Sequence, residues 1–334
     1  MDFARNLKSI PHYPLIQKPT PVHAAPELGA WMGRTQLYVK REDQTDTRYG
    51  GNKVRNLEYI FGAALEARAK RLVTLAPLGS NFVAALAAQA ERIGMQTDVF
   101  HFTPADSDLI RVQAQFSARR GARLHIFRGG KYRSAIEAQV ALWKFTSREN
   151  FVIAPGGSST LGILGHIRAF FELKEQIERG EIPMPDILIV GVGTCGTMAG
   201  LLAGAKLTRL PIHILGVRCV DRLVCNRLRI AQLGNAALRK LGVRDRLLSL
   251  RDVDLREEGP LAYGTPLTQA KGLIQEVREK SGIVLDTTYT SKVFAFLQAE
   301  AARGTFQGKK VLYWNTFSPA ALETSMSRER LRLA

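Results

Sequence analysis

The segment that decides the fold is residues 49–58, which read Tyr-Gly-Gly-Asn-Lys-Val-Arg-Asn-Leu-Glu. Its glycine pair lets the backbone turn and approach a ligand closely. Lys53 follows the pair and stands just before an apolar pattern with helical spacing. A lysine held in a partly desolvated turn can lower its pKa and form a Schiff base with an aldehyde. Solvated surface turns also contain these residue types, so the segment indicates a Schiff-base lysine only if other motifs of the chain support a ligand site.

Three other segments, in a fixed order along the chain, support a ligand site. Residues 78–81 read Leu-Gly-Ser-Asn, residues 192–197 read Val-Gly-Thr-Cys-Gly-Thr, and residues 286–292 read Asp-Thr-Thr-Tyr-Thr-Ser-Lys. A Ser-Asn pair at the head of a helix can bind an anion, although it can also be a plain N-cap. A glycine- and threonine-rich loop between a strand and a helix can surround a phosphate with backbone amides.

In this order and at these separations, the motifs resemble those of pyridoxal-phosphate (PLP) enzymes of the tryptophan-synthase-β type, fold type II. The branch that the chain resembles most holds D-cysteine desulfhydrase and 1-aminocyclopropane-1-carboxylate deaminase, and the resemblance runs from about Pro21 to Leu322. It implies an α/β fold with two lobes, each a mainly parallel twisted sheet flanked by helices. The implied larger, cofactor-binding lobe is residues 1–53 plus 165–334, and the smaller inserted lobe is residues 54–164. A homodimer is also implied.

The periodicity of the chain independently favours an α/β fold. Apolar strand-like runs alternate with helical patterns over most of the length, which is typical of βαβ units and a mainly parallel sheet. Residues 187–192, Ile-Leu-Ile-Val-Gly-Val, form a continuous apolar run, as expected of a central strand buried on both faces. Helices are expected over 54–68, 81–93, 109–119, 133–146, 161–178 and 197–206, and further strands over 37–40, 71–75, 98–102, 123–127, 151–157, 212–217 and 311–314.

Composition limits the classes of protein to consider. No apolar run is long enough to span a bilayer. Residues 1–5 lack the charged-then-apolar pattern of a signal peptide, so a cytoplasmic location is expected. The three cysteines, Cys195, Cys219 and Cys225, have no CxxC spacing, and neither a disulfide framework nor a metal site is expected. Cys219 is expected to be a buried thiol, and Cys195 a small filler inside the glycine loop.

The net charge of +17 is high for a metabolic enzyme and raises the question of nucleic-acid binding. The positive charge is spread along the whole chain, however, and no zinc-finger, homeodomain or RNP-type pattern is present. We therefore do not expect a nucleic-acid partner. Attraction for anionic metabolites explains the balance of charge equally well.

The resemblance gives roles to the first two motifs. Lys53 is expected to hold the cofactor covalently and to move protons, and Asn52 to hold the loop or reach the cofactor. Asn81 is expected beside the phenolic oxygen of the cofactor, and Ser80 to assist Lys53, while both bind the substrate carboxylate. The family usually has histidine where this chain has Phe82. Phenylalanine cannot donate a hydrogen bond or carry a proton, so the substrate pocket is expected to differ there.

The glycine loop is expected to bind the cofactor phosphate through residues Gly193, Thr194, Cys195, Gly196 and Thr197. Its small residues let successive amides converge, and the threonine hydroxyls add donors. Cys195 stands where the family usually has glycine. That change is modest if the φ angle is ordinary and costly if φ is positive.

Two tyrosines and the residues near them bear on the reaction. Tyr289 and Tyr263 match active-site tyrosines of the family, although a lone tyrosine is more often a half-buried core residue. Thr290 and Thr316 stand where the cyclopropane deaminases have glutamate and leucine, which favours the desulfhydrase side; Thr316 is expected near the cofactor. Phe317 replaces a usual glycine and, like Phe82, is expected to face the substrate.

The leading interpretation is a PLP-dependent lyase or deaminase, similar to D-cysteine desulfhydrase, that converts a small amino acid into a keto acid and ammonia by β-elimination. One alternative keeps the cofactor but performs β-replacement, as in relatives of cysteine synthase. Another is a catalytically reduced PLP-binding protein with a basic surface, which the two phenylalanines and the charge of +17 motivate. The presence together of Lys53, Ser80 and the two tyrosines argues against that last alternative.

Overall fold

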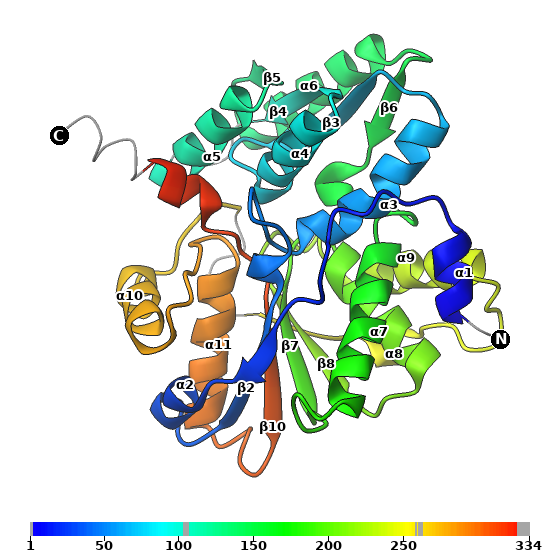
Figure 1. The fold of residues 1–334 in the computed structure, drawn as a ribbon. Coiled ribbons are helices and arrows are strands. Elements are labelled where there is room, and N and C mark those ends of the chain that lie inside the picture. The colour runs from blue at the N-terminus through cyan, green and yellow to red at the C-terminus, as the bar shows by residue number, and fades with distance from the viewer. Residues whose placement is uncertain (1–2, 103–106, 258, 260–262, 326–334) are drawn as a thin grey trace.

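The computed structural model describes residues 3–102, 107–257, 259 and 263–325, which form two mainly parallel sheets flanked by helices (Figure 1). The six-stranded sheet has the order β1-β2-β10-β7-β8-β9, and the four-stranded sheet has the order β5-β4-β3-β6. Only β1 runs antiparallel to its neighbour among these described strands. The expected α/β fold is therefore confirmed.

The six-stranded sheet combines strands from the beginning and the end of the chain, and the four-stranded sheet is formed by the strands between them. The six-stranded sheet contains β1 (Val22–Ala24), β2 (Gln36–Arg41), β7 (Ile187–Val192), β8 (His213–Arg218), β9 (Asp254–Glu257) and β10 (Lys310–Asn315). The four-stranded sheet contains β3 (Arg71–Pro77), β4 (Gln96–Phe102), β5 (Ala122–Phe127) and β6 (Asn150–Ile153). The lobe boundaries given above, at 53/54 and 164/165, stay predictions.

Helices cover both faces of each sheet, as the apolar strands require (Figure 1). In sequence order the helices are α1 (Phe3–Ser9), α2 (Pro26–Trp31), α3 (Lys53–Glu66), α4 (Asn81–Arg92), α5 (Asp108–Arg119), α6 (Lys131–Phe145), α7 (Leu164–Glu178), α8 (Gly196–Thr208), α9 (Arg227–Lys240), α10 (Ala270–Ser281) and α11 (Thr290–Ala302). None of them, within the described residues, has the length and apolar character needed to cross a membrane.

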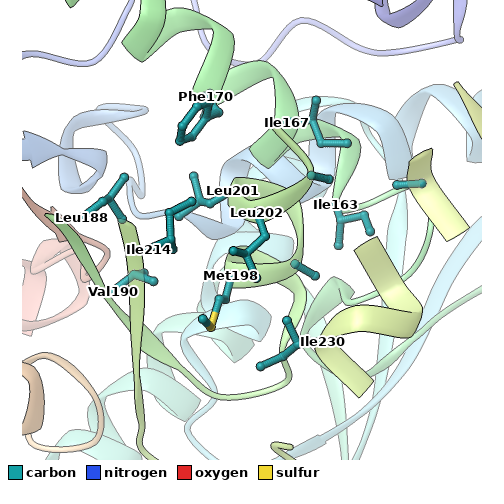
Figure 2. Packing of buried hydrophobic residues seen from close by; sticks show 14 of the residues in the cluster. Ile163, Ile167, Phe170, Leu188, Val190, Met198, Leu201, Leu202, Ile214 and Ile230 are labelled. Atoms are coloured by element: carbon teal, nitrogen blue, oxygen red, sulfur yellow. The ribbon is translucent and has the colours of Figure 1, made fainter. Parts of the chain in front are cut away.

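Strand β7 contributes side chains to two hydrophobic cores, one on each face of the six-stranded sheet. Leu188 and Val190 belong to a core formed with α7, α8 and α9, part of which Figure 2 shows. Ile187 and Ile189, which point to the opposite face, belong to a second core formed with α2, α10 and α11. The alternation of side chains along a strand explains why an unbroken apolar run is needed here.

Helix α8 packs closely on α7 because glycine recurs at every fourth position along one ridge. A Cβ at Gly200 would lie 2.5 Å from Cβ of His166, and a Cβ at Gly204 would lie 2.5 Å from Cβ of Phe170. Residues four apart lie on the same face of a helix, so the glycines open a groove into which α7 fits. This packing fixes the start of α8, where the glycine loop lies.

Some boundaries differ from those predicted. The strand expected over 151–157 ends at Ile153, because Pro155 starts a short 3-10 turn in which Gly156 has a φ of +66°. The following helix begins at Leu164 and not at 161. The sequence patterns also missed β1, β9, α1, α2, α9, α10 and α11.

Candidate active site

A cavity of about 320 Å³ lies between the two sheets, where β3, β7 and β10 end. Ligands of open parallel sheets bind beyond the carboxyl ends of the strands, and this cavity has that position. It is lined by every residue that the sequence predicted as catalytic, cofactor-binding or substrate-binding: Asn52, Lys53, Ser80, Asn81, Phe82, Gly193, Thr194, Cys195, Gly196, Thr197, Tyr263, Tyr289, Thr316 and Phe317. The structure thus brings together segments that lie far apart in the sequence.

Lys53 is the first residue of α3, and its half-buried side chain lines the cavity. The Nζ atom donates a long hydrogen bond of 3.5 Å to the carbonyl oxygen of Gly156. Burial lowers the pKa of Lys53 to about 8, because the charged amine loses its hydration. Gly51, with a φ of +93°, makes the turn before it, and a Cβ there would lie 2.9 Å from the carbonyl oxygen of Thr316. Only glycine fits this approach.

The glycine loop joins β7 to α8 and faces the cavity. A Cβ at Gly193 would lie 2.8 Å from Cε1 of Tyr289, and a Cβ at Gly196 would lie 2.6 Å from Oγ of Ser158. The Thr194 and Ser158 hydroxyls form a hydrogen bond of 2.6 Å. Close packing on both sides therefore fixes the loop at the start of α8, where free amides can receive an anion.

Cys195 adopts a left-handed conformation, with a φ of +74° and a ψ of −21°. This positive φ is the costly case for replacing glycine by cysteine, because a residue with a Cβ is strained in the left-handed region. The thiol is buried in the core with α8 and α9, and its Sγ lies 3.7 Å from the carbonyl oxygen of Val224. Cys219 is fully buried, as predicted.

A buried hydrogen-bond chain supports the loop from behind. Asn52 Nδ2 donates to Oγ1 of Thr197 over 2.7 Å, and that hydroxyl lies 3.4 Å from Nε2 of His166. The same His166 nitrogen lies 3.0 Å from Oδ1 of Asn56. Burial, followed by the charges of Lys53 and Arg55, lowers the pKa of His166 well below its usual range, so the ring is neutral. No pattern in the sequence singles out His166, which lies inside the amphipathic helix α7.

Ser80 and Asn81 begin α4, but the Ser80 side chain makes no N-cap hydrogen bond. A hydrogen bond instead links Ser80 to the hydroxyl of Tyr263. Asn81 Nδ2 donates to Oδ2 of Asp286 over 3.2 Å, and Asn81 Oδ1 accepts from Nε2 of Gln113 over 3.0 Å. Asn81 thereby connects α4, which packs on the four-stranded sheet, to the segment that precedes α11.

Tyr263 and Tyr289 lie together, with ring centroids 6.1 Å apart and planes at 74°. Burial, with the nearby carboxylate of Asp286, raises the pKa of Tyr263 above its usual range. Burial and Tyr263 do the same for the pKa of Tyr289, with a smaller contribution from Asp286. Both hydroxyls are therefore protonated near neutral pH and can donate hydrogen bonds.

The two phenylalanines line the cavity but are almost wholly buried, each with 1% of its surface exposed. The Phe82 ring packs on Gly157, where a Cβ would lie 2.7 Å from Cε2 of the ring. Thr316 lines the cavity as expected. Thr290 does not line it: its Oγ1 donates to Oδ1 of Asp286 over 2.7 Å, below the cavity wall.

The residues present fit the cofactor that the resemblance implies. A buried amine with a lowered pKa suits attachment of an aldehyde, and a glycine loop at the start of a helix suits a phosphate. Ser80, Asn81 and Thr316, which carry hydroxyl and amide groups, line the same cavity. Two cavity residues that the sequence did not single out are Gly156, beside the lysine, and Arg229, in the first turn of α9.

Comparisons with known proteins agree with this chemistry. D-cysteine desulfhydrase from Serratia proteamaculans is 27% identical over 338 residues, which cover 96% of this chain and 98% of that protein. D-cysteine desulfhydrase from Klebsiella pneumoniae is 29% identical over 309 residues, covering 88% of this chain and 89% of that protein. A solved structure described as an ACC deaminase homologue has a TM-score of 0.82 at 26% identity, over 94% of both chains.

The match to a protein family covers almost the whole described chain. Residues 14–316 match the family described as pyridoxal-phosphate dependent enzyme. This range contains the lysine turn, the Ser-Asn pair, the glycine loop and both tyrosines. The chain therefore belongs to the pyridoxal-phosphate-dependent enzymes, in the branch that holds D-cysteine desulfhydrase and ACC deaminase, and its cofactor is pyridoxal 5'-phosphate.

Proposed function

We propose that this enzyme converts a small amino acid into a keto acid and ammonia by β-elimination and deamination, as a D-cysteine desulfhydrase does. One observation carries the proposal: the amine of Lys53, whose pKa desolvation lowers, shares a cavity with Ser80, Tyr263, Tyr289 and the glycine loop. When bound, the cofactor supplies an electron sink for the bonds at the substrate Cα. The protein groups must then position the substrate and move its protons.

Each group has a role that its environment suits. The lowered pKa of Lys53, about 8, leaves part of it as a free amine near neutral pH, so it can accept the proton from Cα. Ser80 and the N-terminus of α4 would receive the substrate carboxylate, since a helix N-terminus with free amides favours an anion. Tyr263 and Tyr289 remain protonated and can donate to the leaving group or to the substrate. Water then releases the amine nitrogen as ammonia.

The cavity wall bears on which substrate fits. Leu75, Pro77 and Phe102 from the four-stranded sheet, together with Phe317, make one side apolar. A pocket of about 320 Å³ must hold the cofactor as well, which leaves room only for a small amino acid. These features support a small substrate with an uncharged β-substituent, such as cysteine.

The test is release of keto acid and ammonia from D-cysteine, L-cysteine and aminocyclopropane carboxylate. Pyruvate from a cysteine enantiomer supports the proposal, and Lys53→Ala should abolish it together with the visible absorption of the bound cofactor. Tyr263→Phe should lower kcat by about tenfold to a hundredfold with the cofactor still bound, because it removes one proton donor. A product formed only when a second nucleophile is added would contradict the proposal and indicate β-replacement.

A further inference from the structure

Arg229 is a cation in the cavity wall that has no carboxylate partner among the described residues. It lies in the first turn of α9, and its backbone N–H donates to Oδ1 of the N-cap Asn226 over 2.9 Å. Its side chain lines the cavity, and its Nε is buried without a hydrogen-bond partner. Leaving a guanidinium partly buried and unpaired costs stability. An anionic ligand in the cavity would remove that cost.

The position of Arg229 is at the glycine-loop end of the cavity. A hydrogen bond with Cys225 lowers the pKa of Cys195, and the positive charges of Arg229 and Arg218 lower it further. Arg229 therefore acts electrostatically on the middle residue of the loop. Arg218, by contrast, is already paired with Glu257. Arg229 is thus the guanidinium left available to a ligand at the loop.

We propose that Arg229 binds the phosphate of the cofactor, adding a charged contact to the amides of the glycine loop. This inference rests on the proposed function only in placing the phosphate at residues 193–197. A guanidinium binds phosphate oxygens through charge-assisted hydrogen bonds, which are stronger than those of neutral donors.

The test compares two forms of the cofactor on the full-length protein. The cofactor is removed, and the protein is titrated with pyridoxal phosphate or with pyridoxal, which lacks the phosphate. Arg229→Gln should weaken binding of pyridoxal phosphate by about tenfold to a hundredfold. Binding of pyridoxal should be unchanged, because its aldehyde still reaches Lys53. Arg229→Lys should recover part of the loss.

Arg227→Gln is the matched control, since it removes the same charge from an exposed position in the same helical turn. It should leave both affinities unchanged. Equal weakening of both ligands by Arg229→Gln, or no weakening of either, would overturn the proposal. So would unchanged cofactor affinity with a raised KM for acidic amino acids such as aspartate or cysteate, which would place Arg229 at the substrate side chain. If the wild-type protein binds neither form, the proposed function itself fails.

Discussion

Lys53 lines the cavity, and the hydrogen-bond partner of its amine is a backbone carbonyl and not a carboxylate. Its Nζ lies 3.5 Å from the oxygen of Gly156, and no carboxylate contributes to its pKa. Lys40, which is also buried, is paired with Glu172 over 2.6 Å. A buried amine with no counter-ion is poised for covalent attachment, whereas a paired one supports the fold.

The lowered pKa of Lys53 leads to a pH prediction. Only the neutral amine attacks an aldehyde, so the rate of cofactor capture should rise with pH and level off above a midpoint of about 8. The rate is measured by stopped-flow absorption after the cofactor-free protein is mixed with pyridoxal phosphate. A midpoint near the ordinary lysine value of 10.5 would show that the amine is solvated and contradict the buried geometry.

The backbone of Cys195 leads to a second prediction. Because its φ is +74°, Cys195→Gly should be more stable than Cys195→Ala by about 1 kcal/mol, since a residue with a Cβ is strained in the left-handed region and glycine is not. Both variants lose the same thiol, so their difference isolates the backbone. Urea unfolding of the two variants measures it. If the alanine variant proves the more stable, the left-handed conformation is wrong.

At the scale of the element, α8 sets the position of the glycine loop through its packing on α7. Gly204 leaves no room for a side chain, since its Cβ would lie 2.5 Å from Cβ of Phe170. Gly272 in α10 is the opposite case, with nothing within 4 Å of a Cβ. The two glycines therefore have different reasons for being in a helix.

The same substitution at these two glycines should have opposite effects. Gly204→Ala should destabilise the protein by about 1 to 3 kcal/mol through overpacking. Gly272→Ala should stabilise it by about 0.5 to 1 kcal/mol, because alanine loses less conformational entropy in a helix. Thermal unfolding of both variants compares them. Equal changes in the two Tm values would show that α7 and α8 are not packed as described.

Sequence patterns predicted the central elements well and the peripheral ones poorly. Strand β7 and helix α4 have long apolar runs or clear helical spacing, so their burial is visible in the sequence. Helix α9 was missed because its buried face includes Ala231, Gly234 and Ala237 among several arginines, which weakens the apolar stripe. Strand β9 has four residues, too few for a period to show.

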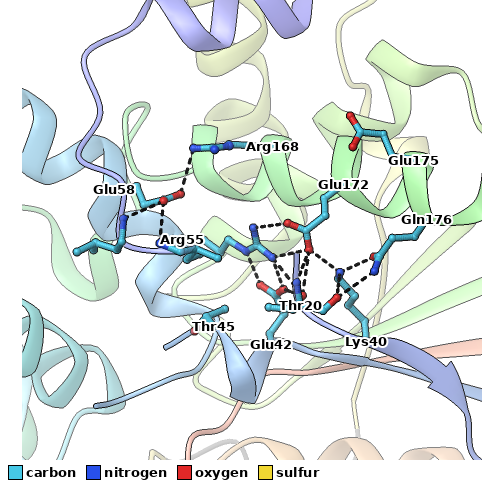
Figure 3. Close-up of polar contacts among 12 residues, drawn as sticks. Thr20, Lys40, Glu42, Thr45, Arg55, Glu58, Arg168, Glu172, Glu175 and Gln176 are labelled. Carbon is cyan, nitrogen blue, oxygen red and sulfur yellow. Dashed lines mark hydrogen bonds and ion pairs between the residues drawn. The ribbon is translucent and has the colours of Figure 1, made fainter. Parts of the chain in front are cut away.

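At the scale of the whole molecule, a buried ion network anchors α3, and with it Lys53, to the six-stranded sheet (Figure 3). Arg55 of α3 pairs with Glu42 over 2.7 Å and with Glu172 of α7 over 2.9 Å. Lys40 of β2 also pairs with Glu172. Two positive and two negative charges balance, which lets the network be buried.

Removing one charge of this network should destabilise the fold. Burial alone raises the pKa of Glu172, but Arg55 and Lys40 outweigh it and lower the pKa to about 2. The folded-state pKa lies below the unfolded value, so the stabilisation is complete above an unfolded pKa of about 4.3 and is lost as pH falls towards about 2. Glu172→Gln should cost about 3 to 5 kcal/mol at neutral pH and flatten the pH dependence in that acid range.

Urea unfolding of the wild type and Glu172→Gln at several pH values tests this prediction. Glu178→Gln is the control, because Glu178 lies on the same helix in an exposed pair with Lys174. That substitution should cost no more than about 0.5 kcal/mol. Equal losses for both variants would mean that the buried network does not anchor the fold.

The positions of the candidate site residues were predictable, but several of their contacts were not. The resemblance gave the cavity residues from Asn52 to Phe317, and all of them line one cavity. The links from Asn81 to Asp286 and from Thr197 to His166 join segments more than 30 residues apart, which no local pattern reveals. In the sequence Arg229 cannot be distinguished from other helical arginines. Only the structure shows that its buried Nε has no hydrogen-bond partner.

The central claim is that the cofactor is attached at Lys53. The most direct measurement is borohydride reduction of the purified holoenzyme, followed by proteolysis and mass spectrometry of the labelled peptide. We predict that the pyridoxyl group is on Lys53, and that Lys53→Ala carries no label. Label on Lys292, which is buried nearby with its Nζ 3.1 Å from the carbonyl oxygen of Cys219, would contradict the assignment of the site.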